Sequence, residues 1–163
     1  MDRKLQLENS NLKNNFTKYF EENNENHKKL KKQLILCSNE ILSKLCFVDH
    51  ENQVVLDTRY FILMATKENY NTISEYVVCI IENLLKEYET VFLHINMQSI
   101  TLTHLDKHYN FIKHICILFQ EKFPDKLEKC FVYNAPFLFS QLFKIVSRFI
   151  DKKTQKKIEL VKE

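Results

Sequence analysis

The sequence contains no glycine, no tryptophan and only 2 prolines in 163 residues. Without glycine, the chain cannot form the phosphate-binding loops of P-loop and dinucleotide-binding proteins, or the GxSxG turn that carries a serine nucleophile. Most classes of nucleotide-dependent enzyme are therefore excluded. Turns that need a positive φ angle must use residues that tolerate it, chiefly asparagine. We expect such turns at Asn52, Asn69, Asn71 and Asn134.

Long hydrophobic runs are also absent. The longest uncharged apolar runs, near residues 60–65 and 76–81, are too short to span a bilayer, and no signal sequence is apparent. The cysteines form an odd set without CxxC spacing, so we expect no disulfide framework or zinc ribbon; they are Cys37, Cys46, Cys79, Cys116 and Cys130. The composition predicts a soluble cytoplasmic protein. Its abundance of Asn and Lys fits an AT-rich genome, such as that of a virus or parasite.

Apolar periodicity predicts strands that alternate with helices. Helices are expected over 28–45, 72–88, 103–123 and 136–150, and a marginal helix over 9–29. Strands are expected over 53–56, 59–65, 91–97, 129–133 and 157–161, the first two forming one bent strand or two strands. This order is typical of an α/β fold with a mostly parallel sheet of about four to five strands flanked by helices. We divide the chain into an N-terminal helical segment, 1–45, and a main domain, 46–163.

The predicted helix at 136–150 combines a broad apolar face with a basic flank. From Lys144 to Lys157, six basic residues stand against one acid, Asp151, which gives a local charge of +5 in a chain of net charge +3. Such a surface is attracted to an anionic membrane. A core helix with lysines at its edge explains the same pattern, so both interpretations stay open. The apolar face comprises Leu138, Phe139, Leu142, Phe143, Ile145, Val146, Phe149 and Ile150.

Residues 123–158, FPDKLEKCFVYNAPFLFSQLFKIVSRFIDKKTQKKI, resemble a segment of CRAL-TRIO lipid-binding domains. The family segment has the form YPERLxKxYxINAPWxFSxLWKxVKPFLDxxTxxKI. Upstream, residues 49–55 resemble the family's DxxGRPV strand and residues 91–102 its central strand. The likeness therefore extends over about residues 49–160.

The resemblance implies a lipid pocket between the sheet and the helix at 136–150, which acts in the family as a mobile gate. Asp125 and Lys157 occupy the positions of the acid and the lysine of the phosphatidylinositol headgroup site. We expect no catalysis and no cofactor apart from a bound lipid. The expected partners are a phospholipid or similar hydrophobic ligand and, transiently, an anionic membrane. The expected pocket residues are Phe92, Ile95, Phe131, Tyr133, Leu142, Val146 and Phe149, and the expected gate or membrane contacts are Phe139, Phe143, Lys144, Arg148 and Ile150.

Some residues depart from the family pattern. Asn96 and Ser99 replace the acid and the glycine after the central strand, and the LPxxxGG segment that follows in the family is missing. A second interpretation is therefore a protein-interaction scaffold or homodimer of the BCH type with a degenerate pocket. Residues 87–94 resemble the DYTxVYLHH stretch of that branch.

Histidines, cysteines and aromatic residues each suggest a further function. His104 and His108 have the spacing of a metal-binding pair, but no third ligand lies at a suitable spacing, so we expect no metal. His94 is expected to be a hydrogen-bonded core residue. No motif activates a thiol nucleophile, so we expect no enzyme. The aromatic residues follow apolar stripes and do not alternate with basic residues, so we expect no nucleic-acid binding.

Overall fold

The computed structural model describes residues 3–24, 38–135 and 137–162. The chain divides into two compact units, Met1–Leu36 and Cys37–Glu163. In the first unit, helix α1 spans Arg3–Glu22. It begins before the marginal helix predicted over 9–29, of which residues 25–29 lie outside the described residues. Only the end of the helix predicted over 28–45 is described, and it forms α3, Ser38–Leu45.

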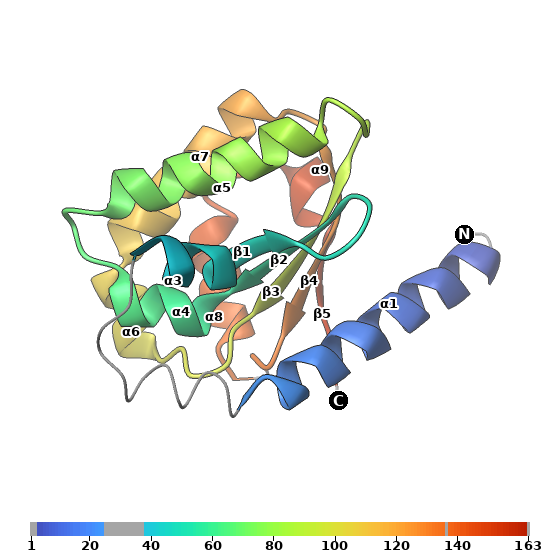
Figure 1. Cartoon of the computed structure of the whole chain (residues 1–163), viewed down its shortest axis with the longest axis horizontal. Coiled ribbons are helices and arrows are strands. Elements are labelled where there is room, and N and C mark those ends of the chain that lie inside the picture. The colour runs from blue at the N-terminus through green and yellow to red at the C-terminus, as the bar shows by residue number, and fades with distance from the viewer. Residues whose placement is uncertain (1–2, 25–37, 136, 163) are drawn as a thin grey trace. The chain divides into compact units, whose positions relative to one another are not determined.

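A five-stranded sheet in the order β1-β2-β3-β4-β5 forms the centre of the second unit (Figure 1). β2 to β5 pair in parallel, whereas β1 is antiparallel to β2. The predicted mostly parallel α/β sheet is therefore confirmed. β1 was not predicted, because its apolar residues directly follow the helix predicted over 28–45 and extend that helix's apolar pattern. The strands are β1 Cys46–Val48, β2 Gln53–Asp57, β3 Val91–Asn96, β4 Leu127–Tyr133 and β5 Ile158–Leu160.

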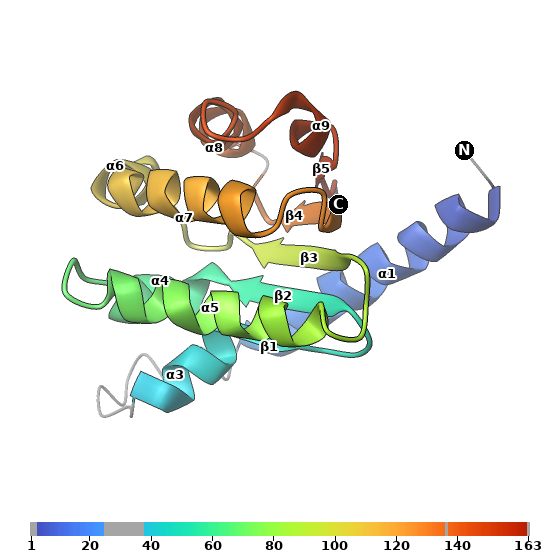
Figure 2. The same cartoon turned by 90° about the horizontal axis from the view of Figure 1, so that it is seen from above.

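The helices that connect the parallel strands lie on one face of the sheet (Figure 2). Because the strands follow in sequence order and parallel crossovers are right-handed, each connection returns on the same side. In the described part of the chain, no helix is long and apolar enough to cross a bilayer. The connecting helices are α4 Thr58–Met64, α5 Tyr70–Leu84, α6 Leu102–Lys107, α7 Tyr109–Lys122, α8 Phe139–Val146 and α9 Lys152–Gln155.

Helix α4 replaces the strand predicted over 59–65. Asp57 ends β2 and caps α4, since its carboxylate accepts a hydrogen bond from the Arg59 backbone N–H. The same carboxylate lies 2.6 Å from the Arg59 guanidinium, and both side chains are almost completely buried. The cap and the buried ion pair outweigh the β propensity of this aromatic and aliphatic segment.

Two helices differ in extent from the prediction. The helix expected over 103–123 is divided at His108, which ends α6 and precedes α7 with φ −103° and ψ 15°. The helix expected over 136–150 is regular only at Phe139–Val146. Apolar periodicity continues across both breaks, so it could not reveal them.

Positive φ angles occur at Glu51, Ser99, Asp125 and Asn134. Only Asn134 was predicted, and the expectation for Asn52, Asn69 and Asn71 is wrong. Asn69 instead has φ −112°, and its side chain hydrogen-bonds to the backbone of Met64 and Thr66. Its role in this turn comes from side-chain hydrogen bonds and not from a left-handed backbone.

Candidate functional site

A cavity of about 300 Å³ lies between the sheet and helices α5, α7 and α8. Leu56 on β2 and Leu93 and Ile95 on β3 line it from the sheet. Apolar residues of the three helices form much of the remaining wall, among them Val77, Ile112, Cys116, Leu142 and Val146. The cavity is thus enclosed by the helices that the parallel topology places on this face.

Four of the residues expected to contact a lipid line this cavity. Ile95, Leu142 and Val146 do so, as does Ile150, which was expected at the gate. Phe149, expected in the pocket, packs against α7 instead. Its ring centroid lies 6.2 Å from that of Tyr109 and 5.7 Å from the Lys113 ammonium nitrogen.

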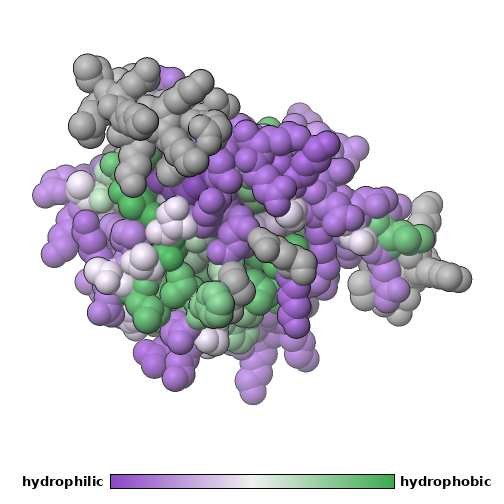
Figure 3. Space-filling view, turned by 90° about the horizontal axis from the view of Figure 1, so that it is seen from below, coloured by the Kyte–Doolittle hydropathy of each residue, from purple (hydrophilic) through white to green (hydrophobic). Residues whose placement is uncertain are grey.

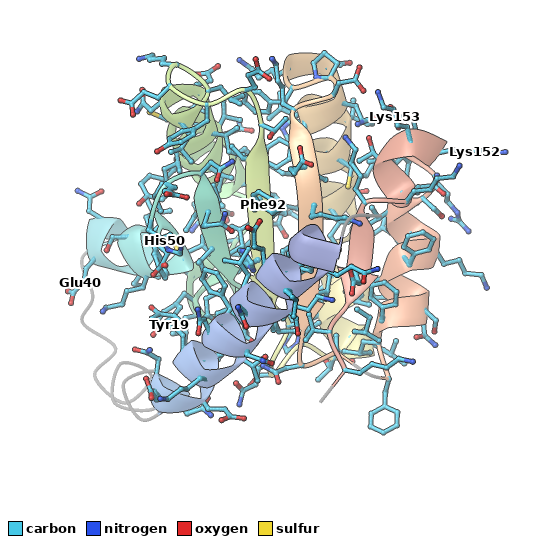
Figure 4. All side chains as sticks on the ribbon, turned by 90° about the vertical axis from the view of Figure 1, so that its right-hand side faces the viewer. Tyr19, Glu40, His50, Phe92, Lys152 and Lys153 are labelled. Atoms are coloured by element: carbon cyan, nitrogen blue, oxygen red, sulfur yellow. The ribbon has the colours of Figure 1, made fainter. Side chains whose placement is uncertain are left out.

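Phe92, Phe131 and Tyr133 lie on the opposite face of the sheet, which requires a correction to the predicted pocket. Successive strand residues point to opposite faces. Ile95 pairs with Val132, whereas Phe131 and Tyr133 pair with the residues on either side of Ile95. Figure 4 looks toward the face on which Phe92 lies. The prediction assigned residues of both faces to one pocket, and the two-residue period of a strand does not allow this.

The opposite face holds a buried polar network. His94 Nδ1 lies 2.9 Å from the Tyr133 hydroxyl, and Nε2 lies 2.8 Å from Gln53 Oε1. Burial, with a smaller contribution from His50, lowers the pKa of His94 to about 3, so its ring is neutral at pH 7. Among the described residues, no buried side-chain nitrogen or oxygen lacks a hydrogen-bond partner. Since His94, Phe131 and Tyr133 are also at most 2% exposed, we call this face of the sheet the filled face.

Asp125 and Lys157 line the cavity at the end where β4 and β5 begin. Asp125 has a φ of 60°, and its carboxylate accepts a 2.8 Å hydrogen bond from Lys153. That hydrogen bond and the charge of Lys153 hold the pKa of Asp125 below its ordinary value. Lys157 donates to the Leu127 carbonyl oxygen. The structure thus brings the two predicted headgroup residues to one end of the cavity.

Lys153 belongs to the same group, although sequence reasoning missed it. Asp151 caps α9 by accepting a 2.7 Å hydrogen bond from the Thr154 backbone N–H. This short helix presents Lys153 to Asp125 across 28 positions of sequence. Figure 4 shows Lys152 and Lys153 extending from α9. Asp is a preferred N-cap residue, so Asp151 is the signal in the sequence that favours a helix start here.

Helix α8 covers the cavity without a fully buried residue of its own. Leu142 and Val146 line the cavity. Phe139 and Phe143, whose ring centroids lie 5.8 Å apart, are half-buried. Lys144 is exposed, and so is Arg148 just beyond the helix. A segment with few buried contacts opens at lower free energy than a core element.

Large apolar side chains are exposed at the ends of the neighbouring helices. Phe137, which precedes α8, is 89% exposed, and Leu102, the first residue of α6, is 57% exposed. Figure 3 shows hydrophobic residues gathered on one face of the molecule and bordered by hydrophilic residues. Exposed apolar surface of this kind is typical of a contact with a membrane or a protein.

Comparison with known proteins assigns the family. The model of the CRAL/TRIO domain matches residues 40–163. The chain belongs to the CRAL/TRIO family. The resemblance recognised at residues 123–158 is therefore confirmed.

Two Sec14 proteins are among the relatives of this CRAL/TRIO chain. The Sec14 cytosolic factor of Schizosaccharomyces pombe is 29% identical over 73 residues, which are 45% of this chain and 26% of the relative. The SEC14 cytosolic factor of Yarrowia lipolytica is 31% identical over 72 residues, which are 44% of this chain and 15% of the relative. The matched regions thus cover about a quarter or less of each relative.

The crystal structure of Sfh5 has a similar fold, with a TM-score of 0.60 and 16% sequence identity. The superposition covers 77% of this chain and 49% of the Sfh5 chain. This likeness confirms the fold class predicted from the sequence.

The thiols of this CRAL/TRIO chain are poor nucleophiles where they are buried. Burial raises the pKa of Cys116 to about 11 and those of Cys46 and Cys130 to about 12. A protonated thiol neither attacks a carbonyl carbon nor binds a metal well. Among the described residues, no three His, Cys, Asp or Glu side chains are grouped to hold a metal ion.

Proposed function

We propose that this chain binds or transfers a lipid without changing it chemically. The observation that carries the proposal is an apolar cavity with charged residues at one end. Membership of the CRAL/TRIO family supports lipid binding or transfer in general. Each acyl methylene group that leaves water contributes about 0.8 kcal/mol, so a few buried groups give measurable affinity.

Asp125, Lys153 and Lys157 are proposed to bind the lipid headgroup. A lysine ammonium group attracts phosphate as a point charge, and a carboxylate accepts a hydrogen bond from a hydroxyl group. Phosphatidylinositol carries both groups. Lys153 lies 2.8 Å from the Asp125 carboxylate, so one headgroup can contact both side chains.

Phosphatidylinositol selectivity tests this assignment. Asp125→Asn removes the charge but keeps a residue that tolerates φ 60°. We expect this variant and Lys157→Gln to lose preference for phosphatidylinositol over phosphatidylcholine in a vesicle-transfer assay, while transfer of phosphatidylcholine continues. Glu128→Gln, a change at a neighbouring exposed acid, serves as the control. Unchanged selectivity in both headgroup variants contradicts the assignment.

Helix α8 is proposed to open as a gate at an anionic membrane. Its Phe139 and Phe143 would exchange contacts with the fold for contacts with lipid, and Lys144 and Arg148 would meet anionic headgroups. Attraction between exposed charges is screened by salt. We therefore expect weaker binding to phosphatidylserine vesicles at 0.5 M than at 0.05 M NaCl, with Lys144→Gln/Arg148→Gln reducing the salt dependence.

The exposed Phe137 supports a second candidate function, a protein-interaction scaffold or homodimer. Light scattering over a concentration series separates a dimer from a monomer. A constant monomer mass argues against self-association through this surface.

Native mass spectrometry of the purified chain tests lipid binding most directly. We expect a stoichiometric lipid to copurify, which organic extraction then identifies. Leu142→Asp, at a residue that lines the cavity, should abolish the bound mass, whereas Gln141→Asp, one position away and exposed, should retain it. An empty wild-type chain that also takes up nothing from phosphatidylinositol or phosphatidylcholine vesicles contradicts the proposal.

A further inference from the structure

The cavity has a second polar end, which carries no formal charge. Thr58, His104 and His108 line it beyond the carboxyl ends of β2 and β3, together with the apolar Phe61 and Leu105. The headgroup residues instead lie where β4 and β5 begin. Because these strands are parallel, their opposite ends lie apart by the length of a strand, about 20 Å for six residues.

Hydrogen bonds at the start of α6 fix the proton on His104. The backbone N–H of Thr101 lies 3.1 Å from His104 Nδ1, and an N–H group can only donate. Nδ1 is therefore the acceptor, and the proton of the neutral ring lies on Nε2. Among the described residues, the structure gives Nε2 no hydrogen-bond partner. His104 thus offers one N–H donor.

The Tyr70 hydroxyl contacts the ring of His108. The Tyr70 hydroxyl lies 2.5 Å from His108 Nδ1, and the described part of the chain supplies no other acceptor for that hydroxyl. When the hydroxyl donates to Nδ1, the ring proton of His108 lies on Nε2. Burial lowers the pKa of His108, so the ring is neutral at pH 7.

Packing holds the His108 donor in place. The ring lies edge-on to Phe61, with the centroids 4.8 Å apart, and edge-on to Tyr70 at 5.8 Å. The backbone N–H of His108 donates to the His104 carbonyl oxygen, so the two imidazoles are one helical turn apart. The Nε2–H of His104, joined by that of His108 when Tyr70 donates to Nδ1, suits an oxygen acceptor attached to a hydrocarbon chain.

We propose that His104 and His108 form a second subsite of the cavity, which binds the acyl oxygen of a single-chain lipid. The acceptor is the carboxylate of a fatty acid or the carbonyl of its ester, and the chain lies along the apolar wall. The inference rests on the proposed lipid binding. The cavity volume of about 300 Å³ lies at the lower limit for ligand pockets, which favours one acyl chain over two.

Three probes of equal chain length test the subsite: palmitic acid, methyl palmitate and hexadecane. Each is offered to the full chain from cyclodextrin, and dissociation constants are measured by native mass spectrometry. We expect palmitic acid to bind about tenfold more tightly than hexadecane, as one or two hydrogen bonds predict. Methyl palmitate binds as tightly as palmitic acid if a carbonyl oxygen is enough for the subsite. It binds as weakly as hexadecane if the subsite requires a carboxylate.

His104→Glu is the decisive variant. Thr-x-x-Glu is a capping box, so the variant keeps the cap of α6 and removes the N–H donor. We expect palmitic acid to lose about tenfold in affinity, with hexadecane unchanged within about twofold. His114→Glu, an exposed change on α7, controls for the change in net charge, and methyl palmitate, which is uncharged, controls for repulsion between the introduced carboxylate and palmitate. For His108 we use no variant, because His108→Phe can disturb the contact with Tyr70. The ¹⁵N chemical shifts of the wild-type imidazoles supply a second readout instead. Nε2 of both rings should shift when palmitic acid binds.

The outcomes separate the two proposals. Equal binding of all three probes by the wild type, or equal losses for palmitic acid in His104→Glu and His114→Glu, overturns the subsite and leaves lipid binding intact. Binding of none of the probes, together with no uptake from phospholipid vesicles, overturns both. If Asp125→Asn loses its selectivity for phosphatidylinositol but keeps its preference for palmitic acid, the two ends of the cavity bind their ligands independently.

Discussion

Residues that alternate along β3 serve different purposes on the two faces of the sheet. Leu93 and Ile95 border a cavity, whereas His94 and Asn96 are completely buried among hydrogen-bonded neighbours. On the filled face, the buried polar side-chain atoms of the described residues have hydrogen-bond partners, whereas the other face leaves space of about 300 Å³. The comparison separates residues that hold the fold from residues available to a ligand. Mutations on the filled face should therefore affect stability, and mutations on the cavity face should affect binding.

The largest effect is expected from breaking the buried ion pair on the filled face. Arg59→Met leaves the Asp57 carboxylate buried without its main charge partner, which costs about 3–5 kcal/mol. The double variant Asp57→Asn/Arg59→Met removes both charges and keeps a good N-cap residue, so most of the loss should be restored. Urea denaturation at pH 7 measures both. If the single and double variants lose the same free energy of unfolding, the unpaired charge of Asp57 does not cause the loss.

The second largest effect is a dependence of stability on pH. Burial lowers the pKa of His94 from 6.5 in the unfolded chain to about 3. Below pH 6.5 the unfolded chain binds a proton that the folded chain does not, so stability is full above pH 6.5 and falls as the pH decreases toward 3. The loss is about 1.4 kcal/mol for each pH unit.

Urea denaturation between pH 7 and 4.5 measures this slope. His94→Gln keeps a donor and an acceptor but does not titrate, so its stability should fall less steeply by about 1.4 kcal/mol per pH unit. His114→Gln, at an exposed position on α7, is the matched control. If stability falls with pH equally steeply in His94→Gln and in the wild type, His94 has the same pKa in the folded and unfolded chains.

The sequence predicted the strands of this sheet better than their faces. Residues that point to either face of β3 are buried or half-buried, so FLHIN at 92–96 has no clear alternation. For this reason Phe92 and Ile95 were assigned to one pocket. The polar His94 in the middle of this run marked the filled face and was correctly predicted as a hydrogen-bonded core residue.

The site was predictable where it follows the motif and not where it depends on local geometry. Asp125 and Lys157 belong to the family pattern, and the structure brings both to one end of the cavity. Lys153 reaches Asp125 only because Asp151 caps α9. The Asp57–Arg59 pair depends on a turn from strand to helix that periodicity does not show.

The smallest effect on stability is expected from filling the cavity. This prediction compares a larger side chain on the cavity face with one on the filled face. Val55 lies on the filled face and is completely buried, so Val55→Phe overpacks the core and costs about 1–3 kcal/mol. Leu93→Phe adds bulk next to open space, so its cost should stay below about 1 kcal/mol while the ring occupies volume that a lipid would need.

Urea denaturation and native mass spectrometry of the two variants separate stability from binding. We expect Leu93→Phe to retain its stability and lose copurified lipid, and Val55→Phe to lose stability while its folded fraction retains lipid. If both variants lose the same free energy of unfolding, the cavity offers no more room than the core. If Leu93→Phe is stable and still binds lipid fully, the ligand lies elsewhere, because a ring and an acyl chain cannot share a space this small.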